Sequence, residues 1–217
     1  MKVLVIGASG GSGRAAVHSL AAAGHDVTAF CRNPDALDDV PATVRRHRGD
    51  ATIPADVDAA VAGQDAVVVT LGIREDALRV RLFGSRGTPM DVRSAGTRHV
   101  IAAMQRHGVR RLVVQTTYGI GESRGRLPLA WRLIFALLLE PQIADSVRQE
   151  QDVRASGLDW VLVQPVGLTD TEAAADLFAS ATGSVRSFKV PRGAVGRFLA
   201  SAVSGPQYVH RTVALST

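Results

Sequence analysis

The sequence is poor in cysteine and in lysine, and both shortages limit its chemistry. Among its 217 residues there is one cysteine, Cys31, so the chain cannot form an internal disulfide. Lys2 and Lys189 are the only lysines among the 25 basic residues, and the others are arginines. The six histidines and the one cysteine show no spacing typical of metal ligands, so we expect no metal site.

Aromatic residues are also scarce, at 5% of the chain, although the formal net charge is +5. The arginines are scattered, and no basic surface interleaved with aromatic residues accompanies them, so we expect no nucleic-acid partner. A basic balance also suits an anionic dinucleotide ligand.

Long apolar runs are missing as well. The most apolar stretch, Leu127–Leu139, contains Arg132 and is shorter than the roughly 20 residues that cross a bilayer, so we expect no membrane span. The chain passes from Met1 directly into strand-like residues without a charged region, an apolar region and a cleavage site. This start predicts a cytoplasmic location.

Segments rich in Val, Ile and Leu alternate along the chain with Ala-rich segments of helical periodicity, and no linker or repeat interrupts them. The alternation predicts an α/β fold in which residues 1–217 form a single domain, a doubly wound parallel sheet with helices on both faces. The predicted strands are 2–6, 26–31, 44–48, 66–71, 112–116, 159–164, 184–190 and 208–215. The predicted helices are 11–23, 34–39, 53–62, 90–107, 143–155 and 193–203.

A glycine-rich turn joins the first predicted strand to the first predicted helix. There Gly7 permits a tight turn, Gly10 lets the backbone approach a pyrophosphate, and Gly13 lets the helix pack closely on the strand. A turn that merely connects strand to helix is the alternative, but it needs fewer glycines. The pattern therefore predicts a Rossmann fold that binds a dinucleotide at the start of the helix. The predicted pyrophosphate site comprises Gly7, Ser9, Gly10, Gly11, Ser12 and Gly13.

The end of the second predicted strand bears on the choice of cofactor. An acid at this place binds the ribose 2′-hydroxyl of NAD, whereas a cation pairs with the 2′-phosphate of NADP. The sequence continues from Cys31 with Arg32, and its first acid is Asp35. Since a guanidinium offers paired donors to phosphate oxygens, NADP(H) is favoured over NAD(H). A solvated loop arginine is the alternative.

Several further segments, in order along most of the chain, resemble the atypical short-chain dehydrogenase/reductases that include NmrA-like proteins and flavin reductases of the biliverdin reductase B type. Besides the glycine turn and Arg32, the segments that carry the resemblance are 49–51, 62–67, 71–72, 102–104, 107–109, 116–117 and 156–160.

The resemblance implies the rest of the cofactor site. Asp50 and Ala51 would lie beside the adenine, although a turn residue is an equally good interpretation of Asp50. The ribose and phosphates would pass along Leu71, Gly72 and Arg74. The nicotinamide would be flanked by Thr116, Thr117 and the segment from Pro165 to Leu168, with elements of the substrate pocket mainly in residues 117–190.

The catalytic pattern of short-chain dehydrogenases is absent. Their tyrosine is assisted by a lysine four residues later, but Tyr118 is followed at that spacing by Glu122 and Tyr208 by Thr212. The positions that align with this pair are Gln142 and Ser146.

The serine and histidine of the flavin-reductase branch correspond here to Thr117 and Gly167. Thr117 and Tyr118 are therefore the remaining catalytic candidates, the latter as a donor, as an aromatic wall or as a packing residue. His99 and His210 are expected to pack or to lie on the surface.

The apolar segment Leu127–Leu139 leaves three alternatives open, namely core packing, a homodimer interface, or a lid over a lipophilic acceptor.

The sequence thus predicts an NADPH-dependent oxidoreductase that passes hydride to a flavin, a quinone or a similar conjugated small molecule. The missing catalytic groups leave a non-catalytic NADP(H)-binding sensor of NmrA-like type as the alternative. An epimerase is disfavoured, because the chain is short for a sugar-nucleotide domain and lacks the Tyr/Lys pair.

Overall fold

A computed structural model describes residues 1–73, 75, 79–80, 83–127, 140–171 and 176–217. Its centre is a sheet of eight strands in the order β3-β2-β1-β4-β5-β6-β10-β8. Every described neighbouring pair in this sheet is parallel except β10 and β8. The strands are β1 (Lys2–Ile6), β2 (Asp26–Cys31), β3 (Arg45–Arg48), β4 (Ala66–Val69), β5 (Arg111–Gln115), β6 (Asp159–Pro165), β8 (Phe178–Ser180) and β10 (Arg211–Ser216).

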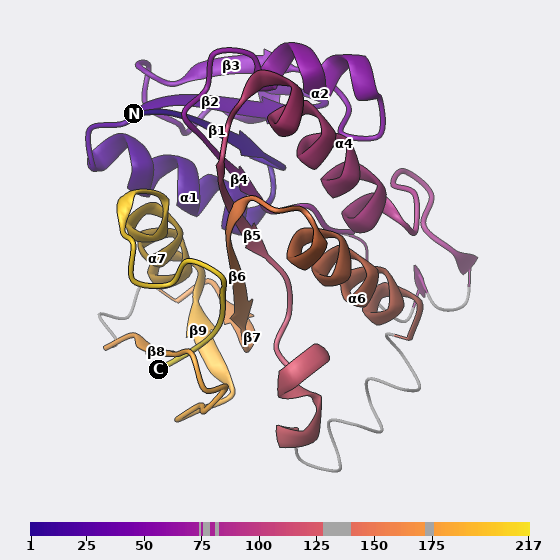
Figure 1. Cartoon of the computed structure of the whole chain (residues 1–217), viewed down its shortest axis with the longest axis vertical. Coiled ribbons are helices and arrows are strands. Elements are labelled where there is room, and N and C mark those ends of the chain that lie inside the picture. The colour runs from indigo at the N-terminus through magenta and orange to yellow at the C-terminus, as the bar shows by residue number, and fades with distance from the viewer. Residues whose placement is uncertain (74, 76–78, 81–82, 128–139, 172–175) are drawn as a thin grey trace.

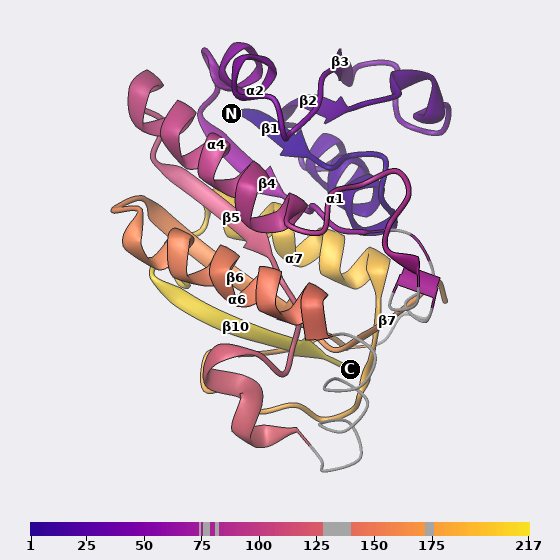
Figure 2. The ribbon, with the colours of Figure 1, turned by 90° about the vertical axis from the view of Figure 1, so that its right-hand side faces the viewer.

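Helices cover both faces of the sheet (Figures 1 and 2). One layer consists of α1 (Gly11–Ala22) and α7 (Arg192–Ser204), and the other consists of α2 (Pro54–Val61), α4 (Val92–His107) and α6 (Glu140–Ala155). Short 3-10 helices follow β2 (η1, Pro34–Ala36) and β5 (η2, Gly121–Arg126). The predicted doubly wound α/β architecture is confirmed.

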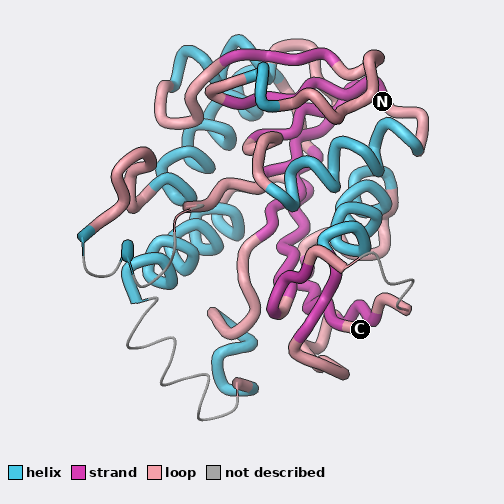
Figure 3. Tube along the Cα trace, turned by 180° about the vertical axis from the view of Figure 1, so that it is seen from behind, coloured by secondary structure: helices cyan, strands magenta, loops and turns pink. Residues whose placement is uncertain are grey.

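Strand β1 shows why the chain folds into three layers. Its side chains alternate between the two faces, so that Val3 and Val5 join the apolar cluster under α1 and α7, while Leu4 and Ile6 join the cluster on the opposite face. All four side chains are fully buried, and each such burial contributes about 1.5–3 kcal/mol to folding. Seen from behind, the strands form a band between the two helical layers (Figure 3).

One predicted strand of the C-terminal part, residues 184–190, is corrected by the structure. Within 184–190 only the last two residues are extended, in β9 (Lys189–Pro191), which pairs with β7 (Gly167–Thr169) outside the main sheet. The amides of Ser184 and Arg186 donate instead to the side-chain oxygens of Ser180 and Ser216, at 3.2 and 3.0 Å. Strands β7 and β8 were not predicted, since each has only three residues.

Other element boundaries shift by a few residues. The predicted strand 66–71 ends at Val69, because its neighbour β1 ends at Ile6 and the chain turns at Gly7. The last strand begins at Arg211 rather than at residue 208, because His210 has a left-handed backbone with a φ of 58°.

Helix boundaries also differ slightly. Helix α4 begins two residues later than predicted, η1 is shorter, and α6 begins three residues earlier. The predicted apolar segment Leu127–Leu139 lies outside the described residues except for Leu127, which is buried. Within the described part of the chain, no helix is long and apolar enough to cross a membrane.

Candidate functional site

A cleft of about 600 Å³ opens where the parallel strands β1, β2, β4 and β5 end. Because these strands run in one direction, the loops that leave their carboxyl ends meet at one edge of the sheet. The residues that line the cleft are Gly7, Ser9–Ser12 (residues 9–12), Phe30, Cys31, Arg32, Gly49, Asp50, Ala51, Thr70–Ile73 (residues 70–73), Thr88, Pro89, Val92, Arg93, Gln115, Thr116, Thr117, Leu168, Asp170 and Arg192.

The glycine turn forms the floor of this cleft. Gly7 has a φ of 88°, a conformation that favours glycine, and a Cβ atom there would lie 2.8 Å from the carbonyl oxygen of Thr70. Gly13 does not line the cleft, because it faces the strand, where a Cβ would approach the carbonyl oxygen of Gly7 to 2.2 Å. Gly13 therefore has the packing role that its position in the motif predicts.

The start of α1 offers free donors to an anion. Its N-cap is Gly10, which has no side chain to cap the helix, and the first turn contains no acidic residue. The first amide groups of a helix lack partners inside the helix and carry a partial positive charge. Gly10 also leaves space, since its nearest neighbour to a Cβ would be 3.4 Å away. These features fit the diphosphate of a dinucleotide.

Arg32 stands at the cleft just beyond β2, as predicted. Its guanidinium donates to the carbonyl oxygen of Gly87 and, over 3.0 Å, to Oγ1 of Thr88. Asp35, the first acid after β2, lies in η1 and does not line the cleft. The cation is thus held at the mouth of the site by a loop that lies 55 residues further along the chain.

Asp50 and Ala51 line the cleft next to each other. Oδ1 of Asp50 accepts from the amide and the hydroxyl of Thr52 at 2.9 and 2.8 Å, so Asp50 also has the turn role that was its alternative interpretation. The carbonyl oxygen of Ala51 lies 3.0 Å from Nδ1 of His99. This contact, like that of His210 with the carbonyl oxygen of Leu158, agrees with a packing role for both histidines.

The end of β5 brings two predicted residues into the cleft. Thr116 is buried, and its hydroxyl donates to Oε1 of Glu150 at 2.7 Å. Thr117 is half-buried, and its hydroxyl makes only a long contact of 3.5 Å with the carbonyl oxygen of Tyr118. Leu168 reaches the cleft from β7, whereas Pro165 is buried at the end of β6 and does not line it.

Tyr118, which the sequence allowed as a catalytic donor, does not lie at the cleft. It is 3% exposed, its hydroxyl donates to the carbonyl oxygen of Gly183 at 3.0 Å, and its ring packs edge-on against Phe188. Burial raises the pKa of the phenol. Because Tyr118 does not line the cleft, its contacts favour the packing interpretation.

Ser146 does not line the cleft either, and its hydroxyl donates back to the carbonyl oxygen of Gln142. Arg74 lies outside the described residues.

Sequence reasoning missed several residues of the cleft. Among them, Thr70 and Gln115 each precede a recognised motif by one position, and the ends of the parallel strands could have indicated both. Arg192 and Asp170, which form an ion pair, come from the C-terminal part of the chain. No local signal marks Arg93 or Arg192, because only tertiary packing brings α4 and α7 to this edge of the sheet.

Comparison with known proteins identifies the family of the chain. Residues 7–206 match the model of the NAD(P)H-binding family, so the chain belongs to that family. The matched region begins at the first glycine of the turn and extends past the end of α7. The predicted Rossmann fold and NAD(P)H-binding class are confirmed, and the resemblance to atypical short-chain dehydrogenase/reductases fits both.

Solved structures share the fold along the whole chain. ChuY, an anaerobillin reductase from Escherichia coli O157:H7, has a TM-score of 0.80 at 22% identity and covers 100% of this chain and 97% of its own. A Rossmann-fold NAD(P)-binding family protein from Shigella flexneri has a TM-score of 0.72 at 24% identity. The match covers 99% of this chain and 92% of that protein. A short-chain dehydrogenase/reductase from Veillonella parvula DSM 2008 in complex with NADP has a TM-score of 0.78 at 16% identity. The match covers 100% of this chain and 94% of that protein.

A sequence relative is more similar but over a shorter segment. The 2-alkyl-3-oxoalkanoate reductase of Stenotrophomonas maltophilia strain K279a is 37% identical over 117 residues, which are 54% of this chain and 33% of the relative. The chain thus spans about a third of the length of the curated relative that it matches.

Proposed function

We propose that this protein is an NADPH-dependent reductase that passes hydride to a flavin, a quinone or a similar conjugated acceptor. The observation that carries the proposal is the cleft itself, which runs from the uncapped start of α1 to Thr116 and Thr117 at the end of β5. Two proteins with similar sequence or structure are named as reductases, which supports the reaction class.

The first residues of α1 hold the diphosphate in this proposal, and Arg32 selects the phosphorylated cofactor. The guanidinium of Arg32 is already held at the cleft by Thr88, and it can turn two of its donors toward a 2′-phosphate. No acid among the described lining residues follows β2 directly, which leaves the ribose of NAD without its usual acceptor.

The acceptor class follows from the groups that are available to supply a proton. The described lining residues include no tyrosine, lysine or histidine, and the proton of Thr116 is already bonded to Glu150. NADPH supplies a hydride when bound and becomes NADP⁺, while the reduced acceptor takes one proton from water. A conjugated acceptor tolerates this arrangement, since it needs alignment more than a strong acid. We assign the remaining donor role to the hydroxyl of Thr117.

The proposal is tested in two stages with the purified chain. Calorimetric titration with NADPH and NADH measures cofactor binding, and loss of the reduced-nicotinamide absorbance then measures turnover with a panel of flavins, quinones and a 3-oxo acid. We expect binding of NADPH and turnover of at least one flavin or quinone. Tight binding without turnover across the panel would instead favour the non-catalytic NADP(H)-binding sensor, and turnover of the 3-oxo acid alone would contradict the conjugated acceptor.

A further inference from the structure

Three arginines line the described part of the cleft, and they differ in their partners. Arg32 donates to Thr88, and Arg192 forms an ion pair with Asp170. The guanidinium of Arg93 makes no hydrogen bond or ion pair with any described residue, and its Nη1 atom is shielded from solvent without a hydrogen-bond partner. A buried cationic donor without a partner is costly, so this arginine is suited to an anion that the described residues do not provide.

The nearest carboxylate does not fill this role. Asp145, on α6, is fully buried, and its two oxygens accept from the backbone amides of Arg93 and Ser94 at 3.0 and 3.1 Å. Asp145 thus caps the start of α4 and leaves the guanidinium of Arg93 unbound. Burial lowers the pKa of Arg93 and the charge of Asp145 raises it, but an arginine remains cationic at neutral pH.

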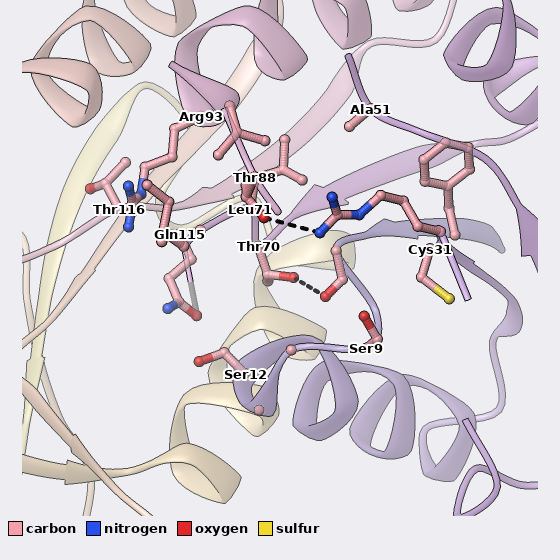
Figure 4. A pocket seen from close by; sticks show the side chains of 18 of the residues that line it. Ser9, Ser12, Cys31, Ala51, Thr70, Leu71, Thr88, Arg93, Gln115 and Thr116 are labelled. Carbon is pink, nitrogen blue, oxygen red and sulfur yellow. Dashed lines mark hydrogen bonds between the residues drawn. The ribbon is translucent and has the colours of Figure 1, made fainter. Parts of the chain in front are cut away.

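The surroundings of Arg93 hold the guanidinium at the cleft wall. A Cβ atom on Gly72 would lie 3.3 Å from Nη2 of Arg93, so the absence of a side chain there makes room for the guanidinium. Gln115, on β5, also lines the cleft, and its side-chain amide makes no hydrogen bond with a described residue, so its Nε2 group is free to donate to a ligand. Figure 4 shows Arg93 and Thr116 on one side of the cleft and Ser9 and Ser12 on another, with the amide of Gln115 extending between them.

We propose that Arg93 binds a carboxylate of the acceptor and that the amide of Gln115 donates a second hydrogen bond to it. This inference rests on the proposed reductase function. The diphosphate and the 2′-phosphate are served by α1 and Arg32 at other places in the cleft. The reduced nicotinamide ring is uncharged and the oxidised ring is cationic, so neither needs a cation beside it. The missing anion therefore belongs to the acceptor, which is a conjugated molecule with an acidic side chain.

The test compares one quinone that carries a carboxylate side chain with the methyl ester of the same compound. In Arg93→Met we expect kcat/KM for the carboxylate to fall by about 10- to 100-fold, the usual value of a charge-assisted hydrogen bond, with little change for the ester. Arg93→Lys should recover part of the loss. The matched control is Arg98→Met, on the same helix, where the arginine pairs with Asp152 at the surface.

Binding measurements keep the test independent of turnover. Calorimetry on the NADP⁺-loaded protein should detect the carboxylate with wild type and with Arg98→Met but not with Arg93→Met, and the Kd for NADPH should agree within a factor of about two in all three. If wild type turns over neither quinone but still binds the carboxylate through Arg93, the reductase proposal fails and the anion site stands. Equal losses for carboxylate and ester, or a parallel loss of NADPH affinity, would overturn the proposal.

Discussion

The hydroxyl of Thr116 donates to Oε1 of Glu150 over 2.7 Å, and the amide of Gln164 donates to the same oxygen over the same distance. Glu150 is 3% exposed, and its second oxygen lies 3.6 Å from the guanidinium of Arg154. A buried carboxylate is thereby surrounded by donors on both oxygens. The arrangement commits the proton of Thr116 to a buried carboxylate.

The hydrogen bonds to Glu150 lead to a prediction about stability. Glu150→Gln should lower the free energy of unfolding by about 1–3 kcal/mol, because at least one donor of the network loses its charged acceptor. The control is Glu122→Gln. This variant removes a carboxylate that also pairs with Arg154 but is 71% exposed, so the free energy of unfolding should change little. Urea denaturation of both variants measures the difference, and equal losses would show that the buried network has no special value.

Alanine substitutions at two of the glycines in the turn, Gly10 and Gly13, should separate an effect on folding from an effect on cofactor binding. Gly13→Ala places a methyl group where only 2.2 Å separates it from the carbonyl oxygen of Gly7, so overpacking should cost about 1–3 kcal/mol of stability. Gly10→Ala meets its nearest atom at 3.4 Å and should fold almost normally, but in the proposed binding mode its methyl group would lie where the diphosphate binds. We expect NADPH affinity to fall at least about tenfold in this variant, as one charge-assisted contact is lost. Thermal denaturation and calorimetry together check the pair, and a Gly10→Ala variant that binds normally contradicts the assignment.

Arg32→Ala should weaken NADPH by about 10- to 100-fold and NADH far less, since a charge-assisted contact with the 2′-phosphate is lost. The variant also removes the hydrogen bond between Arg32 and Thr88, so a control has to exclude an effect that comes from the loop containing Thr88. Thr88→Val removes the contact with the guanidinium but leaves the charge, and it should keep the preference for NADPH. Calorimetric titration with both cofactors gives the four affinities. Equal losses of NADPH and NADH in Arg32→Ala would refute the 2′-phosphate assignment.

Tyr118→Phe tests whether the tyrosine packs or catalyses. Loss of the hydrogen bond to Gly183 should cost about 1 kcal/mol at neutral pH, and turnover should stay unchanged. The pKa of the Tyr118 phenol is raised in the folded chain. The stabilisation that the protonated hydroxyl contributes is therefore fully present below the ordinary pKa near 10, and it is lost as the pH rises through the pKa of the folded state. The stability difference between the two proteins should therefore shrink above about pH 10. A large loss of kcat in Tyr118→Phe at neutral pH would restore the catalytic interpretation.

The parts of the site that the sequence predicted are those that depend on neighbours along the chain. Each of these residues follows the end of a parallel strand closely, and the structure places them all at the cleft: Gly7, residues 9–12, Arg32, Asp50, Ala51, Leu71 and Gly72. Position after a strand is a reliable guide because all these strands run in one direction. Pro165 was expected to follow the predicted strand 159–164, but it is the last residue of β6 and is buried.

The short strands and the C-terminal half were harder to predict. The segments of β7, β8 and β9 have three residues each, too few to show an alternating pattern. The segment between β8 and β9 is held by serine side chains instead of a strand partner, since the amides of Ser184 and Arg186 donate to Ser180 and Ser216.

By itself, the sequence determined that this chain would form a doubly wound α/β sheet with a dinucleotide turn after the first strand, because hydrophobic periodicity and glycine spacing act over a few residues. Only the tertiary structure decided which side chains share the cleft and which are already bonded. Tyr118 is turned into the core while the guanidinium of Arg93 has no partner among the described residues, and these outcomes depend on the packing of α4, α6 and the 178–191 segment, which are far apart in the sequence. Contacts between distant segments produce no periodic pattern in the sequence from which they could be predicted.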